Sequence, residues 1–184
     1  MAKVYALDGI VPVVDPSAFV HPDAVLIGDV IVGADCYVGP CAVLRGDFGR
    51  IRLAAGVNVQ DGCVIHSNVG VEVLVDVGGH IGHGAVIHGC RIGRNALVGM
   101  NAVVMDDAVV GDNAFVAASA FVPKGMQVPA GVLVAGVPAR VVRGLSDAEI
   151  AGKAGGTRLY QQLARRSLAT MVAVAPLVHE EDRG

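Results

Sequence analysis

Residues 91–122 repeat one pattern every six positions, in the stretch RIGRNALVGMNAVVMDDAVVGDNAFVAASAFV. The series of branched aliphatic residues with this spacing is Val86, Ile92, Val98, Val104, Val110, Val116, Val122, Val128 and Val134. An earlier run between positions 14 and 44 keeps the same step. Neither the 3.6-residue period of a helix nor the alternation of an ordinary strand explains it. The step predicts a hexapeptide β-helix, in which three hexads complete one eighteen-residue coil.

Composition favours the same architecture. Hydrophobic residues make up 53% of the chain, yet aromatic residues only 4%, and 25 of the 184 residues are glycine. A narrow, regular core filled by small and branched side chains explains an apolar chain with so few rings, and the glycines suit many tight turns. We therefore expect an all-β fold, a left-handed parallel β-helix shaped as a three-sided prism, followed by a C-terminal α-helix.

Charge and hydropathy exclude several function classes. The net charge of -3 and the absence of a basic run argue against nucleic-acid binding. Polar residues interrupt every apolar run, so no membrane span is expected. No secretory signal is recognised, and the four cysteines lack a C-x-x-C pairing. These features predict a cytoplasmic protein whose cysteines are buried small hydrophobes.

The repeat also predicts the domain boundaries. The β-helix should span residues 1–144, with irregular hexads at 48–56, a loop at 67–79 and a closing turn near Pro138. Ser146 and Glu149 form a capping-box pattern that begins a helix within residues 145–172, which should lay its apolar side on the prism. Gly155-Gly156 is expected to break or kink this helix, and residues 173–184 are expected to form a frayed tail.

Four histidines, at positions 66, 80, 83 and 88, lie within 23 residues and straddle the predicted loop. His66 and His88 are separated by one coil plus four residues that the loop can absorb, so they can stack on one face. His83 precedes His88 by five residues and must project elsewhere. Three histidines with an open position form a catalytic metal site, and bringing all three together requires a second chain. The spacing therefore predicts a homotrimer with metal sites between subunits. His80 has no assigned role.

A polar cluster precedes the histidines. Arg45 and Asp47 are two residues apart on an extended strand and so share one side. They could join subunits as a structural ion pair, which is compatible with a place near the metal. Gln60 carries both a donor and an acceptor and could orient a metal-bound hydroxide; Asn58 and Asp61 flank it.

Together these motifs resemble the γ-class carbonic anhydrases and their relatives, over nearly the whole chain. The resemblance rests on Arg45-Gly46-Asp47, Asn58-x-Gln60-Asp61, His66, and Gly82-His83-x-x-x-x-His88-Gly89. It implies that His66 and His88 of one subunit and His83 of its neighbour bind Zn²⁺, or else Fe²⁺ or Co²⁺. It also implies that Gln60 holds the metal-bound water, that Arg45 and Asp47 join the interface, that Asp61 and Asn58 lie near the metal, and that Tyr160 of the helix reaches the site.

The expected activity is hydration of CO₂ to bicarbonate by a hydroxide that the metal generates at neutral pH. Phe48 follows Asp47 where the family's fast enzymes carry a proton-shuttling glutamate, and Glu72 of the loop is the acidic candidate for this role. A second hypothesis is that the same hydroxide hydrolyses an acyl-CoA thioester, as the phenylacetic acid degradation branch of the family suggests. A third is a hexapeptide acyltransferase, and a fourth is a non-catalytic assembly protein. Metal content would separate the last two from the others.

Overall fold

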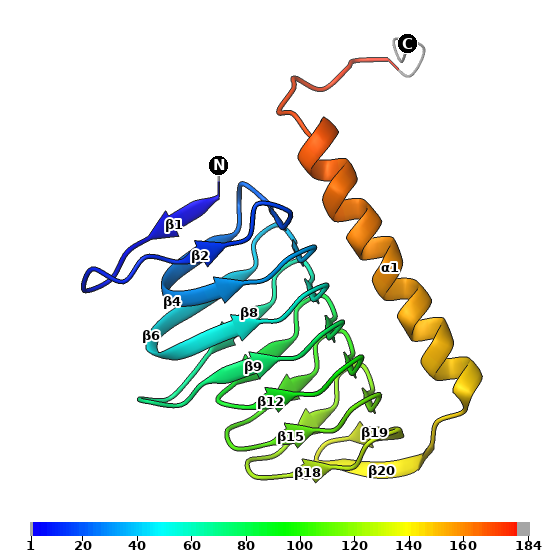
Figure 1. The fold of residues 1–184 in the computed structure, drawn as a ribbon. Coiled ribbons are helices and arrows are strands. Elements are labelled where there is room, and N and C mark those ends of the chain that lie inside the picture. Colours follow the sequence, from blue (N-terminus) through cyan, green and yellow to red (C-terminus); the bar gives the residue numbers. More distant parts are fainter. Residues whose placement is uncertain (1, 180–184) are drawn as a thin grey trace.

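The computed structural model describes residues 2–179 and contains a left-handed parallel β-helix with one C-terminal helix beside it (Figure 1). Three ladders of short parallel strands form the faces of the prism. The first face consists of β1 (Lys3–Tyr5), the first half of β4 (Val25–Val32), the first half of β6 (Val43–Leu53), β8 (Val64–His66), β11 (Val86–His88), β14 (Val103–Val104) and β17 (Phe121–Val122).

The second face shares two strands with the first, because β4 and β6 continue around a corner. It consists of β2 (Val13–Val14), the second halves of β4 and β6, β9 (Val73–Val75), β12 (Arg91–Ile92), β15 (Val109–Val110) and β18 (Gln127–Val128). The third face consists of β3 (Phe19–Val20), β5 (Tyr37–Val38), β7 (Asn58–Val59), β10 (His80–Ile81), β13 (Leu97–Val98), β16 (Phe115–Val116), β19 (Val132–Gly136) and β20 (Ala139–Gly144). β19 and β20 are antiparallel and close the prism at the predicted turn.

The core is a single column of small and branched side chains. The six-residue series fills it, with Ile92, Val98, Val104, Val110, Val116 and Val122 fully or almost fully buried. Cys36, Cys63 and Cys90 are buried as predicted, whereas Cys41 is exposed at a corner. Burial raises the pKa of the Cys36 and Cys90 thiols to about 12, so both stay protonated and unreactive.

The two irregular stretches are more ordered than the sequence predicts. Residues 48–53 continue β6 without a break. The expected loop at 67–79 is shorter, because β9 lies inside it and both Val73 and Val75 are fully buried. The alternating sequence Val73-Leu74-Val75 restores the inward and outward pattern of a strand, so the extra residues of this coil are confined to its first part.

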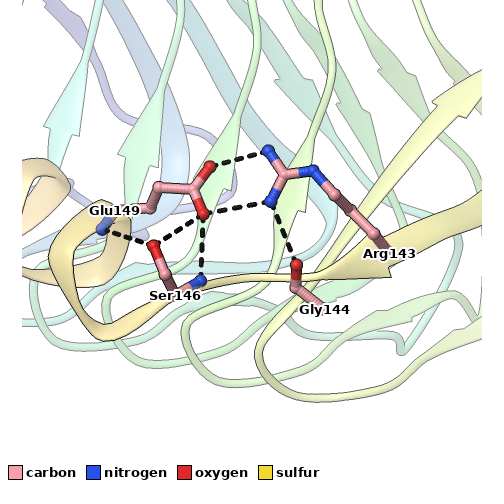
Figure 2. Close-up of polar contacts among 4 residues, drawn as sticks. All are labelled: Arg143, Gly144, Ser146 and Glu149. Atoms are coloured by element: carbon pink, nitrogen blue, oxygen red, sulfur yellow. Dashed lines mark hydrogen bonds and ion pairs between the residues drawn. The ribbon is translucent and has the colours of Figure 1, made fainter.

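The helix α1 (Asp147–Thr170) begins with the predicted capping box. The Ser146 hydroxyl accepts a hydrogen bond from the backbone N–H of Glu149, and the Glu149 carboxylate accepts one from the backbone N–H of Ser146. Arg143, at the end of β20, binds the same carboxylate at 2.7 and 3.0 Å (Figure 2). These contacts hold the pKa of Glu149 at about 2, with Arg143 the largest cause. The start of the helix is thereby tied to the last strand.

One expectation for the helix is wrong, because it runs through Gly155-Gly156 without a break. The helix packs over β3, β5 and β7. Its Tyr160, Leu163 and Ala164 form an apolar cluster with Phe19 and Tyr37 of the prism, as expected, and polar residues are buried beside them, namely Lys153, Thr157 and Ser167. Contacts on both sides of the glycine pair fix the helix to the prism, which explains why the pair is tolerated. Residues 171–179 are largely exposed and contain neither helix nor strand, while the rest of the predicted tail lies outside the described residues. Within residues 2–179, no helix has the length and apolarity that crossing a bilayer requires.

Lys153 makes stability depend on pH. Its ammonium group donates to the Gly78 carbonyl and, at 3.1 Å, to Asn95 Oδ1, and burial lowers its pKa from 10.5 to about 7. Between these values the unfolded chain binds more protons than the folded chain, so the free energy of unfolding should rise by about 1 kcal/mol per pH unit. We expect Lys153→Met to remove that rise, as measured by denaturant unfolding at pH 7.5 and 9.5. Equal slopes for both proteins would contradict the assignment.

Candidate functional site

His66 and His88 stack on the first face, as the spacing of 22 residues predicts. They are direct partners in the ladder between β8 and β11, and Arg45 of β6 is the next partner beside His66. The two ring centroids are 5.1 Å apart, and His66 Nδ1 lies 3.0 Å from His88 Nε2. The rings therefore present one nitrogen each to a common point.

A carboxylate lies behind each ring. Asp47 Oδ1 is 2.9 Å from His66 Nε2, and Asp106 Oδ1 is 2.5 Å from His88 Nδ1. The pKa of Asp47 is lowered overall: burial opposes this, but hydrogen bonds from Arg45 and His66 outweigh it. The hydrogen bond from His88 is the main cause that lowers the pKa of Asp106. Both groups are thus carboxylates at neutral pH and can only accept hydrogen bonds.

This arrangement fits a metal ion. A carboxylate only accepts hydrogen bonds, so if both rings are neutral their protons would lie on His66 Nε2 and His88 Nδ1, opposite Asp47 and Asp106. The facing nitrogens then both carry lone pairs, at a separation of 3.0 Å. Two imidazole ligands of a tetrahedral Zn²⁺ with bonds of about 2.0–2.1 Å lie about 3.3 Å apart. A cation between these nitrogens would turn a repulsive contact into a favourable one, and ligating histidines usually have such a carboxylate behind them.

Arg45 binds Asp47 within one chain, at 2.5 Å between Nη1 and Oδ2. Residues two apart on β6 point to the same side, which brings the two side chains together. The place at a subunit interface that the resemblance implies for them stays a prediction. Within the chain, Arg45 therefore orients the carboxylate that in turn orients His66.

His83 lies apart from the other two predicted ligands. It occupies the turn between β10 and β11, about half exposed, with Nδ1 3.2 Å from Asp61 Oδ2. Its backbone N–H donates to Gln60 Oε1 at 3.2 Å. Among the described residues of a single chain, no three His, Cys, Asp or Glu side chains are grouped so that they could hold a metal. The chain thus brings two predicted ligands together and leaves the third accessible at a corner.

A second polar cluster surrounds Gln60 on the third face. Gln60 Nε2 lies 2.6 Å from His80 Nε2 and donates to Asn58 Oδ1 at 3.1 Å. The Tyr160 ring meets the His80 ring edge-on, with centroids 5.4 Å apart. Burial lowers the pKa of His80 to about 4, so this ring is neutral at physiological pH. His80, to which the sequence assigned no role, therefore helps to hold the amide of Gln60.

A cavity of about 400 Å³ opens beside this cluster. Gln60, His80, His83 and Tyr160 border it on one side. Leu97, Phe115 and Leu133, which follow one another at intervals of eighteen residues on the third face, form an apolar wall. Tyr160 and His83 thus border the same cavity.

Two residues that the sequence analysis linked to proton transfer, Phe48 and Glu72, can now be placed relative to His66. Phe48 is 55% exposed and its ring lies 5.4 Å from the His66 ring, so an apolar side chain borders the histidine pair. Glu72, the predicted acidic candidate, binds Arg52 Nε at 2.9 Å, and Arg52 belongs to the second face. This ion pair directs Glu72 away from the first face.

Sequence reasoning missed Asp106. It follows His88 by eighteen residues, which is one complete coil, and so lies next to it on the adjoining coil. The repeat could have identified Asp106, because a polar residue eighteen positions after a candidate ligand lies next to that ligand on the adjoining coil.

Comparisons with known proteins agree with the fold. Residues 12–46 and 89–124 match the family described as bacterial transferase hexapeptide (six repeats). The carnitine operon proteins CaiE of Escherichia coli O157:H7 and of Shigella flexneri serotype 5b (strain 8401) are each 52% identical over 178 residues, which is 97% of this chain and 91% of the relative.

Two solved structures are also similar. A hexapeptide transferase family protein from Anaplasma phagocytophilum is 34% identical, with a TM-score of 0.86 over 89% of this chain and 97% of the other. A putative acetyltransferase from Bacillus cereus is 28% identical, with a TM-score of 0.90 over 91% and 98% of the two chains. With a relative at 52% identity along nearly its whole length, the chain belongs to the hexapeptide-repeat transferase family that includes the carnitine operon protein CaiE.

Proposed function

We propose that this protein is a metal-dependent enzyme of the γ-class carbonic anhydrase type that hydrates CO₂ at sites shared between the subunits of a homotrimer. The main support is the pair of facing nitrogens on His66 and His88, each ring backed by a carboxylate. His83 of a neighbouring chain would complete the ligand set. The motifs around these residues resemble those of the phenylacetic acid degradation protein PaaY.

When bound, Zn²⁺, Fe²⁺ or Co²⁺ supplies a hydroxide nucleophile at neutral pH, because it lowers the pKa of a coordinated water to about 7. The residues of this chain prepare the site. Asp47 and Asp106 fix the two rings, and Arg45 holds Asp47. Gln60 anchors the backbone of His83, while His80 and Asn58 hold the Gln60 amide. Phe48 excludes water from one side of His66 and offers no proton carrier, so turnover should be slow.

A second candidate is hydrolysis of an acyl-CoA thioester at the same site. The cavity beside His83 favours it, since a volume of about 400 Å³ with an apolar wall exceeds what CO₂ needs and suits an acyl group. Acyl transfer is a third candidate, supported by the resemblance to the putative acetyltransferase of Bacillus cereus. A non-catalytic assembly role is a fourth candidate. It gives no reason for the ordered pair of His66 and His88, each backed by a carboxylate.

Stopped-flow CO₂ hydration by the Zn²⁺-reconstituted protein tests the proposal, with His83→Ala as the control. We expect measurable hydration that falls by more than about 100-fold in the variant. Hydration that persists in His83→Ala would contradict the proposed ligand set. If metal binds stoichiometrically but CO₂ is not hydrated, the thioester hypothesis should be tested with an aromatic acyl-CoA. If no metal binds, acyl transfer becomes the leading candidate.

A further inference from the structure

Asp106 and His88 form one of the shortest side-chain contacts on the first face. Asp106 follows β14 at a corner, and its Oδ1 lies 2.5 Å from His88 Nδ1. The side chain of Asp106 is 17% exposed and that of His88 26%, so both are largely shielded from water. A hydrogen bond to a carboxylate in such a place is stronger than one to a neutral acceptor.

The surroundings of Asp106 keep its carboxylate in place. Its backbone carbonyl accepts a hydrogen bond from the backbone N–H of Gly125 at 2.8 Å. Gly89, directly after His88, lies against it: a Cβ at this position would collide with Asp106 Oδ1. The absence of a side chain at Gly89 therefore lets the carboxylate approach the ring.

The two carboxylates of the site, Asp47 and Asp106, differ in their hydrogen-bond partners. Asp47 divides its oxygens between Arg45 and His66, with Oδ2 on the guanidinium group and Oδ1 on the ring. Within residues 2–179, no arginine forms an ion pair with Asp106, whose Oδ1 faces His88. Each ring thus has one carboxylate partner, and for His88 this partner comes from the adjoining coil.

We propose that Asp106 is a positioning residue, which keeps the proton of His88 on Nδ1 and so directs the Nε2 lone pair toward His66. The inference rests on the proposed metal site, to which it adds a residue from the adjoining coil. A ring without this partner could rotate or carry its proton on Nε2, and either change would withdraw the lone pair.

Asp106→Ala, Asp106→Asn and Asp112→Ala test the inference. Asp112 is a matched control, because it follows Asp106 by one hexad and binds the backbone N–H of Arg94 at 2.8 Å. Zn²⁺ affinity of the metal-free proteins is measured by competition with a chromophoric chelator. We expect Asp106→Ala to bind about 10- to 100-fold more weakly. Asp106→Asn should lose less, since its amide oxygen can still accept from Nδ1–H, and Asp112→Ala should match the wild type.

A second measurement needs no metal. ¹H–¹⁵N spectra of the metal-free protein report which ring nitrogen of His88 carries the proton. We expect Nδ1–H in the wild type and in Asp112→Ala, and a loss of this preference in Asp106→Ala. Wild-type affinity in Asp106→Ala, or Nε2–H on His88 of the wild type, would overturn the inference. If the wild type binds no Zn²⁺ but His88 carries Nδ1–H, the proposed function fails while the positioning role stands.

Discussion

Mixing His83→Ala chains with His88→Ala chains should restore about a quarter of the wild-type metal binding and CO₂ hydration, although each variant alone has neither. The reason is the separation of His83 from the His66–His88 pair within one chain. In a cyclic trimer each site takes the pair from one chain and His83 from the next. A site is complete only when a His83→Ala chain supplies the pair and a His88→Ala chain supplies His83. Random assembly of equal amounts gives this order at about one site in four.

The experiment is done by refolding the two chains together and measuring bound Zn²⁺ and hydration on the mixed trimers. The control mixes His66→Ala with His88→Ala. These variants remove ligands from the same half of the site, so no order of the chains rebuilds it, and no activity should return. Recovery in this control, or none in the first mixture, would rule out a site shared between neighbouring chains.

The largest expected loss of stability follows from Ile87→Ala. Ile87 is fully buried and lies in the ladder between Ile65 and Val104, so its side chain fills one layer of the column. The prism has little freedom to collapse around a vacancy, because neighbouring coils are tied by parallel ladders. We expect the free energy of unfolding to fall by about 2–5 kcal/mol.

Chemical denaturation at equal protein concentration measures this change, since association contributes to the stability of an oligomer. The control is Leu159→Ala, at a helix position that is 64% exposed, where we expect a change within about 0.5 kcal/mol. Similar losses at both positions would mean that the column of side chains does not dominate stability.

The sequence predicts the fold well because the repeat leaves little choice. A branched aliphatic at every sixth position implies the coil, and counting coils places His66 beside His88. The loop at 67–79 was drawn too long because glycines and polar residues hid the strand Val73–Val75. The helix surface was predicted only in part, because polar residues are buried beside its apolar ones. One of them is Lys153, whose ammonium group donates to the carbonyl of Gly78, far away in the chain.

The candidate site was predicted less completely for two physical reasons. A residue such as His80 has no recognisable role until its amide partners, Asn58 and Gln60, are seen around it. The ion pair between Arg45 and Asp47 within one chain depends on side-chain reach, which spacing alone does not give.

The contacts of α1 couple the length of the helix to the number of coils (Figure 1). The helix touches Asn95 through Lys153, His80 through Tyr160 and Asp35 through Arg165, and thus passes several coils in turn. Coils stack at about 4.8 Å, and a helix rises about 1.5 Å per residue. Gaining or losing one coil would therefore displace these contacts by about three helical residues. The length of α1 therefore has to match the number of coils. In evolution, we expect a gain or loss of a coil to be accompanied by a matching change in the length of the helix.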